Sequence, residues 1–330
     1  MIASQLFVFC LSSVLSADEE DSVRNARRPS SETELKKWLT NMVTFHGFTS
    51  AEVKAATGME LSEIEAVRKR LGLSEVKIPE PTIDSPLLVL PYPGGRHPRI
   101  GFLEGAVEPQ RETKLSIFAP WKGNSSIRSY VVADIPEAIW WERDAPETAE
   151  KKGRELLYLA HSHIDTFWTQ QKVKLEKQEW LETKPGVFEM TRKLPNGITF
   201  GTRVQSHPDH VDMEQWISNG TEKTLTGLRV QNCIMLKGAP EFSGLHNDNK
   251  VFREPYAACR DDSGKRWIIS AWDPCISAWG NAKCPCLHSD PKFPDCKPGA
   301  TVLLRGWLSF FEGSDIDAEL DRIQGTGWRK

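Results

Sequence analysis

The sequence lacks an excess of charge of either sign. Lys and Arg number 42 and Asp and Glu number 45, which leaves a formal net charge of −3, and both signs are mixed along the 330 residues. Nucleic acids and anionic membranes attract proteins through clustered positive charge. We therefore expect no nucleic-acid partner and favour a small or neutral polar ligand.

Long apolar runs are also nearly absent. The one candidate lies in the first residues, IASQLFVFCLSSVLSADEED, and it is shorter than the ~20 apolar residues that a bilayer span requires. Small residues and then acids follow it, which is typical of a secretory signal peptide, although no positive charge follows Met1. We expect residues 1–17 to be a signal peptide, the protein to be exported (periplasmic or extracellular), and no membrane span to remain after cleavage.

Cysteine is scarce too, with seven residues, of which Cys10 would leave with the signal peptide. An even number of cysteines in an exported chain favours disulfides, and sequence alone does not choose the connectivity. The six remaining disulfide candidates are Cys233, Cys259, Cys275, Cys284, Cys286 and Cys296. Four of the six lie between Cys275 and Cys296, so crosslinks would be concentrated in one loop.

Helical periodicity occurs over residues 31–75, after a polar linker over residues 18–30, and again in SDIDAELDRIQ after Gly313, where a short terminal helix is expected. Ser31 precedes Glu34 by three residues, a capping-box arrangement, and apolar residues follow at helical spacing. Two further short helices are expected to begin near Ser50 and Ser62. This three-helix domain resembles the small helix-turn-helix units of transcription regulators. Because its acids and bases balance, we expect it to contact another envelope protein rather than DNA.

After a Pro-rich linker over residues 76–85, the hydrophobic period changes to two. Segments such as RSYVVADI, GITFGTRVQ and GLRVQNCIML suit strands, and turn signals such as PNG and SNGT separate them. Many short strands at such spacing predict antiparallel sheets rather than alternating βαβ units. The sequence therefore predicts a mainly β protein: an antiparallel β-sandwich over residues 86–330, preceded by the small three-helix domain.

The segment LYLAHSHIDTFW places His161 and His163 on one face of a strand, because residues two apart share a face. This spacing suits a shared divalent metal such as Zn, Cu or Ca, with His288 as a third ligand. Without a metal, either histidine could move a proton, and Glu312 at the end of LRGWLSFFEG is the expected partner. The alternative is a polar pair at the rim of the sheet.

The segment CPCLHSDPKFPDC concentrates thiol and imidazole groups and could itself hold Zn²⁺. Its spacing does not match the usual paired CxxC knuckles, and we expect disulfides there instead. The histidine pair also occurs in cupin-like metal dioxygenases, but no Glu lies between Thr169 and Lys172 at the usual short distance after the pair.

Side chains suited to sugar recognition lie in two loops and among the tryptophans. Arginine forks match vicinal hydroxyl and ring oxygens, and flat indole faces stack on sugar rings. Tryptophan is frequent, with 12 residues against 4 tyrosines. The candidate binding residues are Arg96, His97 and Arg99 of PYPGGRHPRIGF, Asn247, Asn249 and Lys250 of NDNK, and Trp168 and Trp279.

The stretches PYPGGRHPRIGFLEGAVEPQRETKLSIFAPW, NGTEKTLTGLRVQNCIMLKG and WGNAKCPCLHSDPKFPDC resemble a family of exported bacterial proteins. The order of strands up to LRGWLSFFEG is similar to the galactose-mutarotase-like supersandwich of aldose epimerases, polysaccharide lyases and glycosidase accessory domains. That resemblance implies a sugar on a concave sheet and a His with Glu or Tyr as acid and base. We expect an exported carbohydrate-active protein; the alternative is a non-catalytic glycan- or protein-binding module of the envelope.

Overall fold

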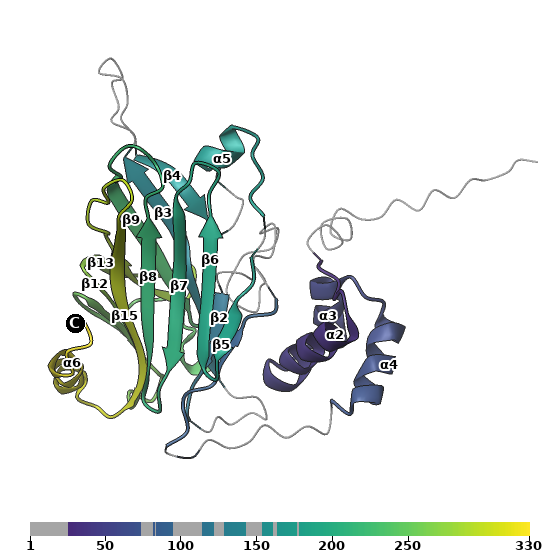
Figure 1. Ribbon diagram of the computed structural model, residues 1–330. Helices are drawn as coiled ribbons and strands as arrows, with labels where there is room; N and C mark the ends of the chain where they lie inside the picture. Colours follow the sequence, from purple (N-terminus) through teal and green to yellow (C-terminus); the bar gives the residue numbers. More distant parts are fainter. Residues whose placement is uncertain are drawn as a thin grey trace, which may run out of the picture.

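The computed structural model describes residues 26–73, 82, 84–94, 114–121, 129–142, 154–160, 164–176 and 178–330. The expected signal peptide lies outside the described residues. A small helical unit and a two-sheet β-sandwich make up the described part (Figure 1). Among its helices, none is both long and apolar enough to cross a membrane.

The helical unit begins with α2 (Glu32–Leu39), which continues into the π-helical segment η1 (Thr40–Phe45). It ends with α3 (Ser50–Thr57) and α4 (Leu61–Leu71). Ser31 caps α2 as the sequence indicates, since its side chain accepts a hydrogen bond from the Glu34 amide. The N-cap of α3 is Thr49, where Glu52 closes a reciprocal capping box.

His46 connects the helical unit to the sandwich. Its side chain is fully buried. Nδ1 donates to the Asn41 carbonyl at 2.9 Å, so Nε2 accepts from the Ser116 hydroxyl at 2.7 Å. Four rings contact the imidazole edge-on: Phe48, Tyr92, Phe118 and Tyr130. The unit therefore shares a continuous core with one sheet of the sandwich.

Two antiparallel sheets form the sandwich, which confirms the predicted fold class. Sheet A has seven strands in the order β1-β2-β3-β9-β14-β13, with β4 paired to β3, and sheet B has eight in the order β10-β11-β12-β15-β8-β7-β6-β5. The strands of sheet A are β1 (Val89–Pro91), β2 (Lys114–Phe118), β3 (Tyr130–Glu142), β4 (Arg154–Leu159), β9 (Thr226–Met235), β13 (Cys275–Asn281) and β14 (Cys286–Pro291). The strands of sheet B are β5 (Leu181–Lys184), β6 (Val187–Lys193), β7 (Thr199–Ser206), β8 (His210–Ser218), β10 (Lys250–Arg253), β11 (Tyr256–Arg260), β12 (Arg266–Asp273) and β15 (Thr301–Glu312).

Alternation along the strands decides which side chains face the core. On β8, Val211, Met213 and Ile217 are buried between the sheets, while Asp212 and Glu214 point to the outer face of sheet B. At this strand, the outer face of sheet B therefore carries polar side chains on which a site can be built.

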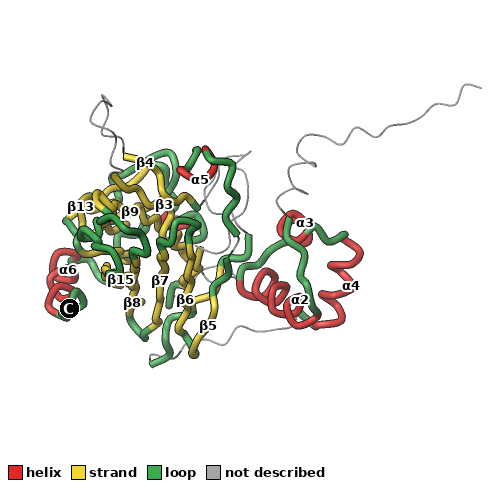
Figure 2. The backbone as a smooth tube through the Cα atoms, turned by 45° about the horizontal axis from the view of Figure 1, so that its top comes forward, coloured by secondary structure: helices red, strands yellow, loops and turns green. Residues whose placement is uncertain are grey.

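Three short helices complete the sandwich: α5 (Phe167–Gln170), the 3₁₀ turn η3 (Pro240–Phe242) and α6 (Ile316–Gly325). Leu320 and Ile323 of α6 pack against Trp307 and Tyr256 on the outer face of sheet B. Figure 2 shows α6 on the side of the strands opposite to the helical unit. The C-terminal residues thereby lie along the outer face of sheet B.

Candidate functional site

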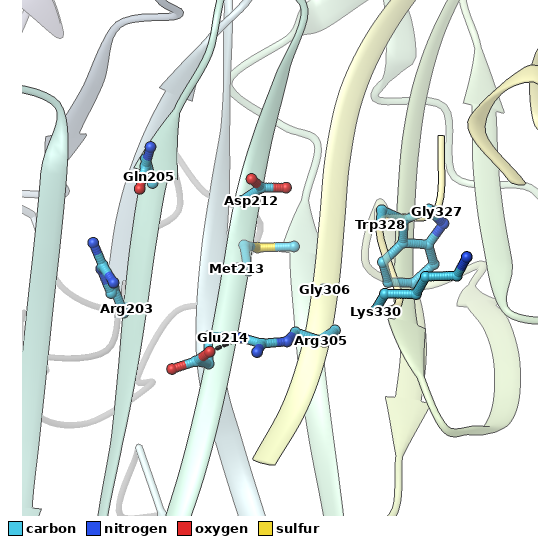
Figure 3. Close-up of a pocket in the computed structure, with 10 residues that line it drawn as sticks. All are labelled: Arg203, Gln205, Asp212, Met213, Glu214, Arg305, Gly306, Gly327, Trp328 and Lys330. Atoms are coloured by element: carbon cyan, nitrogen blue, oxygen red, sulfur yellow. Dashed lines mark ion pairs between the residues drawn. The ribbon is translucent and has the colours of Figure 1, made fainter. Parts of the chain in front are cut away.

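An open pocket of about 300 Å³ lies on the outer face of sheet B, between β7, β8, β15 and the C-terminal residues (Figure 3). The strand register explains its lining. Arg203, Glu214 and Arg305 are directly opposite one another on three neighbouring strands. The lining residues are Arg203, Gln205, Asp212, Met213, Glu214, Arg305, Gly306, Gly327, Trp328 and Lys330.

Both arginine side chains of the pocket are held by ion pairs. Arg305 pairs with Glu214, as Figure 3 shows. Arg203 Nε lies 3.5 Å from Glu189 Oε1 on the next strand. Each guanidinium carries five N–H donors, so a paired arginine still offers donors to a ligand in a fixed orientation. The row therefore presents preoriented hydrogen-bonding groups to the pocket.

Trp328 forms the aromatic wall of the pocket. Its indole N–H donates to the Tyr256 hydroxyl at 3.3 Å, and the Arg329 guanidinium lies 5.4 Å from the ring centroid. Arg329 in turn is 3.5 Å from Asp273 on β12. These contacts attach the C-terminal segment to sheet B and hold the indole beside the charged row.

A histidine and carboxylate cluster adjoins the pocket through Asp212. The His210 imidazole is stacked between His207, at 4.5 Å between centroids, and Trp307, at 3.8 Å. His210 Nδ1 lies 2.7 Å from Asp209 and Nε2 lies 3.4 Å from Asp212, whose other oxygen is 3.0 Å from His207 Nε2. The ring is thus oriented by a carboxylate at each nitrogen.

This arrangement stabilises the protonated form of His210. Burial lowers the pKa of His210, but hydrogen bonds to Asp212 and Asp209 outweigh burial and raise that pKa above its usual value. Burial likewise raises the pKa of both carboxyl groups, yet their bonds to His210 hold both pKa values below the usual range. The protonated imidazole is the form that a general acid requires.

The cluster predicts a pH-dependent stability. Because the pKa of His210 is raised in the folded protein, His210 stabilises the fold fully below its ordinary pKa of 6.5. This stabilisation is lost as the pH rises through the pKa that His210 has in the folded protein. Because the pKa values of Asp209 and Asp212 are lowered, these carboxylates stabilise the fold fully above pH 3.8, their ordinary pKa, and this stabilisation is lost as the pH falls below it. We therefore expect His210→Gln to lower the free energy of unfolding most between pH 3.8 and pH 6.5. Urea unfolding of both proteins across this range measures the difference. A difference that stays constant from pH 3 to 9 would contradict this.

Sequence reasoning missed this cluster, although SHPDHVD contains its residues close together. His210 and Asp212 are two apart on β8, the same period-two signal that drew attention to His161 and His163. The signal becomes specific only with Trp307, which is distant in sequence and lies opposite Asp212 across the strand pair.

Five of the predicted site residues lie outside the described residues: Arg96, His97, Arg99, His161 and His163. Two of the described ones are not brought together. Glu312 is on β15 of sheet B, about two-thirds exposed, with Arg266 Nε at 3.9 Å, whereas His288 is buried on β14 of sheet A. The two candidate partners of His161 and His163 are therefore on different sheets, and the predicted pairing with either histidine lies outside the described residues.

The described residues among the predicted sugar contacts have structural contacts instead. Trp168 is buried in the core, so its indole face is not available to a ligand. Asn247 and Asn249 donate to the carbonyls of Gly280 and Arg260, and Lys250 is buried with its ammonium on the His246 carbonyl. The Trp279 indole is stacked on His288 with 3.8 Å between centroids.

The six described cysteines form no disulfides with one another, which differs from the expectation. Cys259 and Cys296 are buried in the core between the sheets, where each thiol donates to backbone carbonyls. Cys275 accepts a hydrogen bond from the Ser289 hydroxyl. Cys233 and Cys286 lie together on sheet A.

No family model and no curated protein sequence matches the chain. Among solved structures, it is similar to the Slr1438 protein of Synechocystis sp. PCC 6803, at 10% identity over 61% of this chain and 88% of that chain, with a TM-score of 0.33. It is also similar to YeaD of Salmonella typhimurium, named as a mutarotase candidate, at 10% identity over 60% and 79% of the two chains and a TM-score of 0.31. Scores this low carry no argument about activity.

Proposed function

We propose that the protein binds a carbohydrate in the pocket on the outer face of sheet B. The observation that supports it is the row of Arg203, Glu214 and Arg305 beside the Trp328 indole in one open pocket. Sugar rings present vicinal hydroxyl groups, which match guanidinium forks and carboxylate oxygens, and apolar ring faces, which stack on indoles. Cations and carboxylates alternate along this row, which suits an uncharged polar ligand.

A reaction at this site would use His210. Its raised pKa suits the role of proton source, and Asp212, which faces the imidazole and lines the pocket, would lie between His210 and the sugar oxygen that receives the proton. The Glu214 carboxylate, which lies beyond Asp212 on the same face of β8 and pairs with Arg305, would take the role of base. The acid and the base would then lie on the same face of one strand, four residues apart. Export, expected from residues 1–17, is consistent with a glycan ligand and remains part of the proposal.

Binding is tested with the purified full-length chain on a glycan array, followed by calorimetry with the glycan that binds best. We expect Arg305→Ala and Trp328→Ala to weaken binding about 10- to 100-fold, the range for losing a hydrogen bond to a charged group or a stacked aromatic ring. Arg70→Ala, which removes an exposed arginine paired with Glu32 on the helical unit, is the matched control and should leave affinity unchanged. Equal affinity in all variants, or no bound glycan, would refute the proposal.

Catalysis is tested separately, by following the bound sugar with NMR. We expect anomer exchange or bond cleavage in the wild type and its loss in His210→Gln, with glycan affinity changed only a few-fold. Binding without any product would favour the non-catalytic module over the enzyme.

A further inference from the structure

Three metal-ligand side chains meet on the outer face of sheet A, away from the sugar pocket. Cys233 is on β9, and Cys286 and His288 are two residues apart on β14, which pairs with β9 so that His288 lies opposite Cys233. Their ligand atoms all lie within 4.8 Å of one another, and Cys286 Sγ is 3.2 Å from His288 Nε2. All three side chains are buried, with exposures of 5%, 2% and 3%.

A fourth donor is next to them in the turn before β14. The Cys284 thiol is hydrogen-bonded to Cys286. Three sulfurs and one imidazole form the Cys₃His set of structural zinc sites. Zinc–sulfur bonds of about 2.3 Å put tetrahedral sulfurs about 3.7 Å apart, so the ligand atoms of Cys233, Cys286 and His288, which lie within 4.8 Å of one another, need to move by only about 1 Å to share a metal.

The surroundings orient His288 as a metal ligand. Its Nδ1 has no hydrogen-bond partner among the described residues but faces Asp290 Oδ1 at 3.8 Å, which leaves Nε2 directed at the sulfurs. Asp290 is held by the Trp279 indole N–H at 2.7 Å and by the Asn232 amide at 3.2 Å. A carboxylate behind the second nitrogen is the usual support for a metal-bound histidine. Trp279 covers the ring face at an interplanar angle of 5°.

We propose that Cys233, Cys284, Cys286 and His288 bind one Zn²⁺ ion that joins β9 to β14 beneath the helical unit. On binding, the three thiols release their protons to solvent and His288 coordinates as the neutral imidazole through Nε2. Cys233 and Cys286 belong to the same apolar cluster as Leu39 and Met42 of the helical unit, so the ion stabilises the sheet surface on which that unit packs. Of the three histidines that the sequence suggested as metal ligands, the site uses His288, and it adds Cys284 and Cys286 of the CPCLH segment, for which disulfides were expected.

The test is metal analysis of the full-length protein, purified under reducing conditions and dialysed. We expect stoichiometric zinc, and after exchange with Co²⁺ we expect the visible bands of a tetrahedral site together with a thiolate charge-transfer band. Cys286→Ala and His288→Ala should lose the metal, and Cys284→Ala should weaken its retention at least tenfold. Cys259→Ala and Cys296→Ala remove buried thiols outside the cluster and should keep it.

Several results would overturn the proposal. One is a reduced, folded protein that holds no zinc and takes up no Co²⁺. Another is a non-reducing peptide map with a disulfide between any two of Cys233, Cys284 and Cys286. If Cys286→Ala does not fold, the site is tested on the wild-type protein. A chelator should then lower its melting temperature, and added zinc should restore it. An unchanged melting temperature would then count against the site.

Discussion

Replacing Lys114 by Met should lower the free energy of unfolding by about 3–5 kcal/mol, the cost of leaving one buried charge without its partner. Lys114 Nζ lies 3.0 Å from Asp134 Oδ2, and both side chains are fully buried. The two residues are directly opposite on β2 and β3, and the register continues from Asp134 to Cys233 on β9. The pair therefore lies in the same cross-strand row as the proposed zinc ligands.

The double variant Lys114→Met/Asp134→Leu should recover most of this loss. Removing both charges together leaves no unpaired ion, and apolar replacements of similar size often match or exceed the stability of a buried pair. Urea unfolding of the wild type, both single variants and the double variant measures the coupling. Arg70→Ala, at an exposed ion pair, should change stability by less than about 1 kcal/mol. Additive losses in the double variant would contradict the assignment.

Replacing Trp272 by Ala should cost about 3–5 kcal/mol, the range for deleting a large aromatic side chain from a core. Trp272 is fully buried and lies over Gly306, its partner on the neighbouring strand. A Cβ atom added at Gly306 would be 2.8 Å from the indole ring, so the glycine makes room for the tryptophan. The contact joins β12 to β15, and β15 carries Arg305 of the pocket.

Trp272→Phe should cost clearly less than Trp272→Ala. The Trp272 indole N–H has no hydrogen-bond partner among the described residues. Replacement by phenylalanine therefore removes some packing contacts but no hydrogen bond. Trp328→Ala, at the edge of the pocket, is the control and should destabilise by less than either core variant. The measurement is again urea unfolding at neutral pH. An equal loss for Phe and Ala would mean that the indole N–H has an important partner.

Local sequence signals were sufficient for most of the elements, but not for LYLAHSHIDTFW: strand β4 ends at Leu159, and helix α5 begins at Phe167. The capping residues and the 3.6-residue period around Ser31 predicted the helices, because hydrogen bonds at a helix start involve residues three or four apart. The period of two predicted strands such as β8, whose alternate residues are buried and exposed. Together these patterns correctly predicted an antiparallel sandwich after a helical unit.

The sites depended on strand register, which no local signal encodes. The sequence drew attention to His288 and to the cysteines around it, but only the pairing of β9 with β14 places Cys233 opposite that histidine. In the same way, Arg305 and Glu214 became neighbours through the pairing of β15 with β8. Trp168 and Trp279 looked alike as ligand platforms, yet one is enclosed in the core and the other covers His288.

The amino-acid sequence thus decided the type and order of the elements, since these follow from propensity, capping and hydrophobic period within a few residues. The tertiary structure alone decided which polar side chains share a face of a sheet, because contacts between strands distant in sequence are set by the packing of the whole core. For this protein, that packing separates the sugar pocket on sheet B from the cysteine and histidine cluster on sheet A.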